Sequence, residues 1–265
     1  MKFTEKRILG RTGLKVGRLG ISSSFGAPAE AFEEAFDRGC NYFTWGTFIK
    51  GRSPEMKKAM KNIINKGQRE NLIIAMLSYA HIAYLTEGFF LKGLKALGID
   101  YSDILILGYF SRRPSQRILD GALRLKEKGL VRFLGITSHN RKLFPALHKE
   151  GIIDVFHIRY NAAHRGAEVD TFPYLIGDDK PGIVSFTATR WRQLLNQKKM
   201  PKDETALSAI DCYRFVLSNP SVDVCMVGAR SLDQMRENLR TLELSPFNED
   251  ELSRIKKIGD YLYKK

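Results

Sequence analysis

The chain has 265 residues and a formal net charge of +14, with 43 Lys and Arg against 29 Asp and Glu. An apolar share of 43% with 27% charged residues is ordinary for a globular protein, and it excludes a disordered or fibrous chain. Three scattered cysteines, at positions 40, 212 and 225, exclude a disulfide scaffold and a paired-cysteine metal site. The most apolar stretch, residues 72–85, is too short to span a bilayer, and the first residues lack a secretory core. We therefore expect one cytoplasmic domain over residues 1–265, with no membrane association.

The first expected element is a hairpin, because RILGRTGLKVGRLG is typical of two short strands around Thr12 and Gly13. After it, short apolar runs of strand length alternate with longer amphipathic segments. The expected strands cover residues 19–23, 41–45, 71–77, 103–109, 131–137, 154–160, 182–187 and 221–227. The clearest helical patterns cover residues 53–66, 115–128 and 204–218, and the first two begin at Ser53 and Ser115.

The strand runs LIIAML and DILIL are apolar without alternation, which indicates strands covered on both faces, as in a parallel sheet. Eight strand–helix alternations in a chain of this length predict an α/β fold of the (β/α)8 TIM-barrel type, with the hairpin closing its bottom. A doubly wound open sheet is the alternative. It needs fewer strands, and ISSSFGAP after the first barrel strand lacks the Gly-rich phosphate loop of that fold.

The last strand-to-helix segment, VDVCMVGARSLDQMRENL, carries the clearest candidate ligand residues. Gly228 permits a tight turn, Arg230 stands at the expected barrel mouth, and a helix begins near Ser231 with its N–H groups and positive dipole end toward the same space. Three further polar side chains share one side of that helix: Gln234, Glu237 and Asn238. This set suits a phosphorylated adenosine. The alternative is a capped surface helix with Arg230 in solvent.

Several of these segments resemble the aldo-keto reductases along essentially the whole chain. RILGRTGLKVGRLG is similar to the opening hairpin of that family, GCNYF to the start of its first catalytic segment, and LKEKGLVRFLGITSHN to its fifth-strand signature. YNAAHRGAE is similar to a segment of bacterial branches, and GARSLDQMREN to the NADP-binding signature. The resemblance implies an NADP(H)-binding barrel oxidoreductase that acts on a small-molecule carbonyl.

The resemblance also assigns roles to individual residues at the cofactor end. It implies contacts to the adenosine 2′-phosphate and the adenine from five residues of the last segment: Gly228, Arg230, Gln234, Glu237 and Asn238. Phe186 would stack on the nicotinamide in place of the usual tyrosine, and Thr187 would present its hydroxyl to the pyrophosphate. Thr137-Ser138 and His157 stand at the remaining nicotinamide positions, and the alternative for His157 is a satisfied core histidine.

The catalytic end departs from the family pattern. Relatives use a tyrosine as proton donor, a lysine paired with an aspartate that lowers the tyrosine pKa, and a histidine that orients the carbonyl. The resemblance puts other residues at these positions: Thr44 for the aspartate, Ile49 (or Phe48 after a one-residue shift) for the tyrosine, Leu77 for the lysine and Gly108 for the histidine. The site is therefore predicted to be degenerate, with the catalytic residue unknown. Four side chains near strand ends are candidate replacements: Tyr79, His81, Tyr109 and His139.

The remaining candidates have structural interpretations that the pattern favours. Lys50 and Arg52 would add positive charge near the altered segment, and Trp191 between two arginines would wall a pocket or be a half-buried tryptophan. His164 and Arg165 indicate a turn and ion-pair network. Basic residues are spread over helices rather than gathered with aromatics, which argues against nucleic-acid binding, and the histidines and acids show no metal-ligand spacing.

Two functions follow from the sequence. One is an NADP(H)-binding oxidoreductase with a remodelled active site, in which conventional carbonyl reduction is doubtful. The alternative is a catalytically silent NADP(H)-binding sensor or regulatory barrel.

Overall fold

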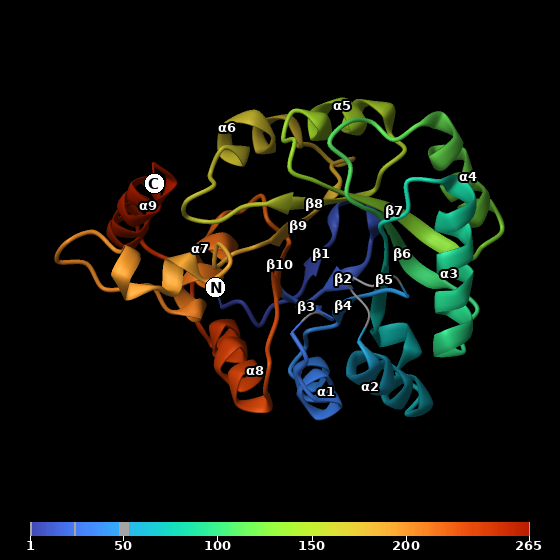
Figure 1. Ribbon diagram of the computed structural model, residues 1–265, viewed down its shortest axis with the longest axis horizontal. Coiled ribbons are helices and arrows are strands. Elements are labelled where there is room, and N and C mark those ends of the chain that lie inside the picture. The colour runs from blue at the N-terminus through green and yellow to red at the C-terminus, as the bar shows by residue number, and fades with distance from the viewer. Residues whose placement is uncertain (1, 24, 48–52, 265) are drawn as a thin grey trace.

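The computed structural model describes residues 2–23, 25–47 and 53–264. Its central feature is a closed barrel of eight parallel strands in the order β10-β3-β4-β5-β6-β7-β8-β9 (Figure 1). The barrel strands are β3 (Leu19–Ser22), β4 (Tyr42–Trp45), β5 (Ile73–Ser78), β6 (Ser102–Leu107), β7 (Val131–Ser138), β8 (Val155–Arg159), β9 (Gly182–Phe186) and β10 (Val224–Val227). The predicted (β/α)8 architecture is confirmed, and the closed strand order excludes the open sheet.

Helices surround the barrel on its outer side (Figure 1). The α-helices are α1 (Ala29–Asp37), α2 (Pro54–Asn65), α3 (Ala83–Leu97), α4 (Gln116–Glu127), α5 (Leu143–Glu150), α6 (Ala167–Asp170), α7 (Ala209–Ser218), α8 (Leu232–Leu239) and α9 (Glu249–Tyr263). Short 3-10 helices are η1 (Gly10–Thr12), η2 (Arg69–Asn71), η3 (Phe172–Tyr174), η4 (Gln193–Leu195), η5 (Gln197–Lys199) and η6 (Arg240–Glu243). None of the described helices has the length and apolar composition needed to cross a membrane.

The helix expected over residues 204–218 begins later than its pattern indicates, at Ala209. Ser208 and Asp211 form a reciprocal capping box, with the Asp211 amide donating to the Ser208 hydroxyl at 3.0 Å and the Ser208 amide donating to the Asp211 carboxylate at 2.9 Å. The preceding residues are extended instead, because the Leu207 amide donates to the Leu194 carbonyl at 3.1 Å. At the earlier helix, Ser53 caps α2 as predicted, whereas the Ser115 side chain makes no capping bond to α4.

The N-terminal hairpin closes the bottom of the barrel, as predicted. It consists of β1 (Arg7–Ile8) and β2 (Lys15–Val16), which pair antiparallel. Leu9 and Val16 are fully buried and join one apolar cluster with inward-facing residues of the barrel strands. A Cβ on Gly182 would lie 2.5 Å from the Leu9 side chain, so a glycine is required where β9 meets the hairpin.

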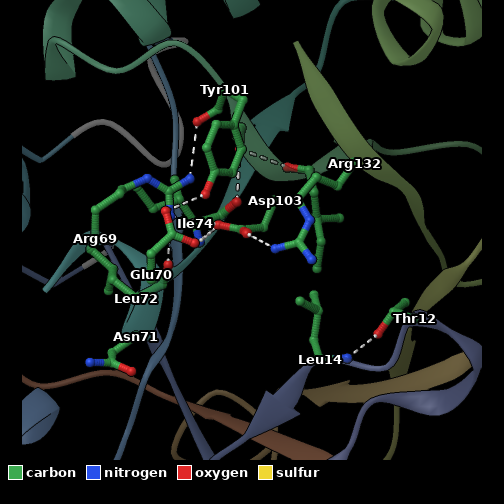
Figure 2. A network of polar contacts seen from close by, with 12 residues as sticks. Thr12, Leu14, Arg69, Glu70, Asn71, Leu72, Ile74, Tyr101, Asp103 and Arg132 are labelled. Carbon is green, nitrogen blue, oxygen red and sulfur yellow. Dashed lines mark hydrogen bonds and ion pairs between the residues drawn. The ribbon is translucent and has the colours of Figure 1, made fainter. Parts of the chain in front are cut away.

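Buried aspartates tie the strands together at this same end. The Asp103 side chain is only 3% exposed and accepts hydrogen bonds of 3.1 Å from both Arg69 and Arg132, as Figure 2 shows. Asp154 and Asp223 likewise accept backbone amides of neighbouring strands. Residues at the amino-terminal face of such a barrel serve stability, whereas loops at the opposite face carry function.

Candidate functional site

A cavity of about 910 Å³ opens at the carboxyl ends of the barrel strands. Strand alternation directs every second side chain into the barrel, and the last inward residues of the strands form the floor of this cavity. These floor residues are Ser22, Thr44, Leu77, Thr137, His157, Phe186 and Met226. Side chains of the following loops form its walls, among them Phe25, Tyr79, His81, Tyr109, His139 and Trp191.

The three described positions expected for the family's catalytic side chains lie at strand ends around this cavity. Thr44 is only 4% exposed, and its hydroxyl lies 3.4 Å from the Ile21 carbonyl oxygen. Leu77 packs against the apolar barrel interior and lines the cavity. A Cβ on Gly108 would lie 2.7 Å from the Thr137 methyl group, so the space for a side chain there is already filled.

The cavity also lacks the charged pair that would accompany a tyrosine acid. Among the described residues, no lysine lines the cavity, and Glu55 is the acidic residue that lines it. The Glu55 carboxylate accepts a hydrogen bond of 3.1 Å from the Ala29 amide at the start of α1. Four residues of the predicted site lie outside the described residues: Phe48, Ile49, Lys50 and Arg52.

Phe186 and Thr187 stand where β9 ends, and both line the cavity. Phe186 is half-buried, and its ring centroid lies 5.5 Å from that of His139 in an edge-on arrangement. Thr187 has a φ of +59°, donates its hydroxyl to the Phe186 carbonyl at 2.7 Å, and accepts the Asn161 side-chain amide on its own carbonyl at 2.8 Å. These contacts hold an aromatic face and a strained backbone turn at the cavity wall.

Backbone strain continues through the loop after β9, residues 187–192. Arg190, Trp191 and Arg192 follow Thr187 into the left-handed region, with φ of +49°, +50° and +68°. Non-glycine residues adopt such angles rarely, and only where surrounding contacts hold the backbone in place. Strained residues of this kind are enriched at functional loops. One such contact is the Arg190 guanidinium, which donates to the Leu262 carbonyl of α9. Trp191 is 60% exposed and forms part of the cavity wall.

The five residues predicted from the last strand-to-helix segment, Gly228, Arg230, Gln234, Glu237 and Asn238, lie in the turn before α8 and along this helix, outside the cavity lining. Three of them are exposed: Arg230, Gln234 and Glu237. Gln234 accepts the Arg230 amide at 2.8 Å. Asn238 is buried and donates to the Gly228 carbonyl at 3.2 Å, which braces the turn from inside.

Gly228 is required by a close neighbour. A Cβ there would lie 2.2 Å from the Phe25 ring, which also lines the cavity. Phe25, 59% exposed with a φ of +96°, therefore connects the cavity wall to the start of α8.

His157 is buried in the core and also lines the cavity, so its contact with a cofactor stays a prediction. Its Nε2 and the Tyr42 hydroxyl form a hydrogen bond of 2.8 Å across the barrel. Burial lowers the pKa of His157 to about 3, so the imidazole is neutral near pH 7. A neutral imidazole at this point can hydrogen-bond an uncharged amide.

The four candidate proton donors all line the cavity. The Tyr109 ring lies 4.7 Å from that of His139, and the His81 ring stacks on Phe110 at 4.3 Å. Burial and then the charge of Arg159 lower the pKa of His139, while burial raises the pKa of Tyr79. Phe186, His139 and Tyr109 thus form a continuous row of rings along one wall.

The turn after β8 has the structural role predicted for it. The Asn161 side-chain oxygen accepts the His164 amide at 3.0 Å, and Arg165 pairs with Asp260 of α9 at 2.7 Å. Glu168 accepts the Tyr160 hydroxyl at 2.6 Å, and Asp170 pairs with Arg141. These contacts fasten the turn to α9.

Comparisons with known proteins find similarity to one family. A family model described as the aldo/keto reductase family matches residues 187–260. L-galactose dehydrogenase from Arabidopsis thaliana is 25% identical over 313 aligned residues, which cover 97% of this chain and 95% of the plant protein. This chain is therefore similar to the aldo/keto reductase family, most clearly over residues 187–260.

Solved structures agree on the fold of this chain. The holo and apo forms of aldo-keto reductase AKR11C1 from Bacillus halodurans each superpose with a TM-score of 0.77 at 22% identity. The alignments cover 96% of this chain and 96% and 95% of the two bacterial chains. The family match begins at Thr187, so it contains the strained loop and the start of α8, and it omits the strands that carry Thr44, Leu77 and Gly108.

Proposed function

We propose that this chain is an aldo-keto reductase-like, NADP(H)-binding oxidoreductase whose active site is remodelled. The observation that carries the proposal is the grouping of Phe186, Thr187 and the start of α8 around one mouth of the barrel. The family match, which starts at Thr187, supports it because it covers six of the seven predicted cofactor residues, all except Phe186. Members of this superfamily use nicotinamide cofactors.

The residues present suit such a cofactor in chemistry and placement. Phe186 offers an aromatic face in the cavity, and Thr137 and His157 offer neutral hydrogen-bonding groups beside it. Arg230 is exposed, and within the described chain its guanidinium forms no ion pair, so its fork can receive the 2′-phosphate. NADPH, when bound, supplies the hydride.

The proton for a carbonyl oxygen must then come from this chain's own side chains. Thr44, Leu77 and Gly108 offer no acid with a suitable position. The Tyr109 ring packs against His139, which in turn packs against Phe186, and we assign Tyr109 as the proton donor. Because the lowered pKa keeps His139 neutral near pH 7, its imidazole can hold the phenol by a hydrogen bond but is a poor source of protons.

Fluorescence titration with NADPH and NADH tests the cofactor assignment. Arg230→Ala removes the proposed phosphate contact, and we expect it to weaken NADPH binding about 10- to 100-fold while leaving NADH unchanged. Arg240→Ala removes an exposed arginine after the end of α8 and serves as the matched control. Equal weakening of both cofactors, or no effect on NADPH, would contradict the assignment.

Steady-state NADPH oxidation with a panel of aldehydes and ketones tests the chemistry. Tyr109→Phe should lower turnover by about 10²- to 10⁴-fold, the usual contribution of one general acid. Turnover unchanged in Tyr109→Phe would refute that residue's role, and tight NADPH binding without turnover of any carbonyl would refute the oxidoreductase proposal.

Tight NADPH binding without turnover is the behaviour of the alternative, a catalytically silent NADP(H)-binding barrel. The absence of the family's catalytic side chains at Thr44, Leu77 and Gly108 favours this alternative. Restoring Thr44→Asp, Ile49→Tyr, Leu77→Lys and Gly108→His would then create activity in an inert scaffold. Because a Cβ at position 108 meets the Thr137 methyl at 2.7 Å, the restored variant also needs Thr137→Ser.

A further inference from the structure

Arg159 is the last residue of β8 and stands beside the proposed nicotinamide position. The β8–β9 register pairs Arg159 with Phe186. Val155 belongs to the cluster inside the barrel and His157 lines the cavity, so alternation along the strand directs Arg159 toward the barrel mouth as well. The cavity wall reaches Tyr109, His139 and Phe186 and stops short of Arg159. A ligand that contacts both the cavity wall at Phe186 and the Arg159 guanidinium therefore has to extend past His139.

The Arg159 guanidinium has no protein partner, whereas comparable guanidinium groups are paired. Across the described ranges, each of the other buried or half-buried arginines donates to a carboxylate or a backbone carbonyl, whereas Arg159 forms neither an ion pair nor a hydrogen bond. Arg69 pairs with Asp103, for example, and the buried Arg18 donates to the Leu217 and Val222 carbonyls. None of its nitrogens is among the fully buried unpaired atoms, so the group stays open to solvent and is free to receive an anion.

The surroundings of Arg159 are also positively charged. Its pKa is lowered first by burial and then by the charge of Arg141, with a further contribution from Arg190. The Asp170 carboxylate is paired with Arg141, and Arg190 donates to the Leu262 carbonyl. Neither contact involves the Arg159 guanidinium. Burial and then Arg159 lower the pKa of His164 to about 4. The charged or titratable groups that act on Arg159 are thus Arg141 and Arg190, which lower its pKa, and the phenols of Tyr109 and Tyr263, which raise it.

A second polar group points to the same missing partner. Nδ1 of His139 is buried and has no hydrogen-bond partner among the described residues. The His139 ring lies between Tyr109 and Phe186, at the edge of the cavity nearest Arg159 in the strand register. Two unsatisfied groups, a guanidinium fork and an imidazole nitrogen, therefore flank the proposed reaction position.

We propose that Arg159 binds the anionic group of the substrate, so that the substrate class is a carbonyl compound bearing a carboxylate or a phosphate. This inference rests on the proposed function for the identity of the reacting group. The planar guanidinium binds either anion through two parallel hydrogen bonds, and the neighbouring arginines disfavour a cationic group in the same place. The carbonyl end then lies in the cavity beside Phe186 and Tyr109.

Calorimetric titration of the full chain, with and without saturating NADP⁺, tests this directly. The probes are 4-formylbenzoate, 4-formylphenyl phosphate and the neutral 4-formylbenzamide, and the first two distinguish a carboxylate from a phosphate site. We expect one of the anions to bind about 10-fold or more tightly than the amide, and Arg159→Met to remove about 10- to 100-fold of that affinity. Arg159→Lys should retain part of it. Arg117→Met, an equal charge change at an exposed position of α4, should have no effect.

Each remaining outcome bears on the proposal. Equal affinity for the anions and the amide, in both the presence and absence of NADP⁺, overturns it, as does anion binding that Arg159→Met leaves unchanged. Weakening of NADPH by Arg159→Met to the same extent as the anion assigns the guanidinium to the cofactor and also overturns it. Arginine-dependent anion binding without turnover of any carbonyl refutes the proposed function alone.

The melting temperature provides a further check. Because Arg159 has no partner, Arg159→Met should leave the Tm unchanged or raise it. A fall in Tm with unaltered anion binding would mark a structural arginine and contradict the proposal.

Discussion

Replacing Gly108 by alanine should destabilise the protein through one identifiable neighbour. The added Cβ would lie 2.7 Å from the Thr137 methyl carbon, about 1 Å closer than an ordinary carbon–carbon contact, and 3.4 Å from the Tyr79 ring. Overpacking of this kind costs about 1–3 kcal/mol. Thr137→Ser removes the methyl carbon and keeps the hydroxyl, so the same glycine substitution should cost about 1 kcal/mol or less in that background.

Urea unfolding of the wild type, the two single variants and the double variant measures this coupling. If the Thr137 methyl group excludes a side chain from position 108, the two substitutions have a favourable interaction free energy of about 1 kcal/mol or more. If Gly108→Ala is as stable as the wild type, or if its cost is the same with serine at position 137, then the Thr137 methyl group does not exclude a side chain from position 108. The absence of a histidine there would then need another physical reason.

Two further predictions concern stability. Asp103→Ala should lower the free energy of unfolding by about 3–5 kcal/mol, because it leaves the half-buried Arg69 and the Ile74 amide without their acceptor. Asp178→Ala, an exposed control near the same end of the barrel, should change the free energy of unfolding little. Equal effects of the two substitutions in urea unfolding would contradict the role of the buried network. The folded-state pKa of His157, about 3, lies below the ordinary value of 6.5, so the unfolded state binds more protons between these values and stability falls as pH decreases through that range. His157→Gln should reduce the slope of this loss by up to about 1.4 kcal/mol per pH unit in pH-dependent urea unfolding, and an unchanged slope would show that His157 does not titrate in this way.

The positions of the strands could be predicted from the local pattern of apolar residues. The start of α7 and the contact that constrains Gly228 could not be predicted in this way. Apolar runs of strand length between helical periods predicted the barrel, and the Thr12-Gly13 turn predicted its closing hairpin. Boundaries were less accurate where a cap outweighs periodicity, as at Ser208, whose capping box with Asp211 starts α7. The glycine at position 228 was predicted as a turn, but the contact that requires it comes from Phe25, about two hundred residues earlier in the chain.

The sequence by itself determined the (β/α)8 architecture, because the alternation of apolar and amphipathic segments is a local property of the chain. It also predicted which positions around the cavity lack the family's catalytic groups. Only the tertiary structure decided which polar groups are satisfied. The positive charge that dominates the composition is paired at Arg69, Arg141 and Arg165, and it is uncompensated at Arg159, where β8 meets β9 beside Phe186. Pairing depends on distances between residues far apart in the chain, and no local pattern contains those distances.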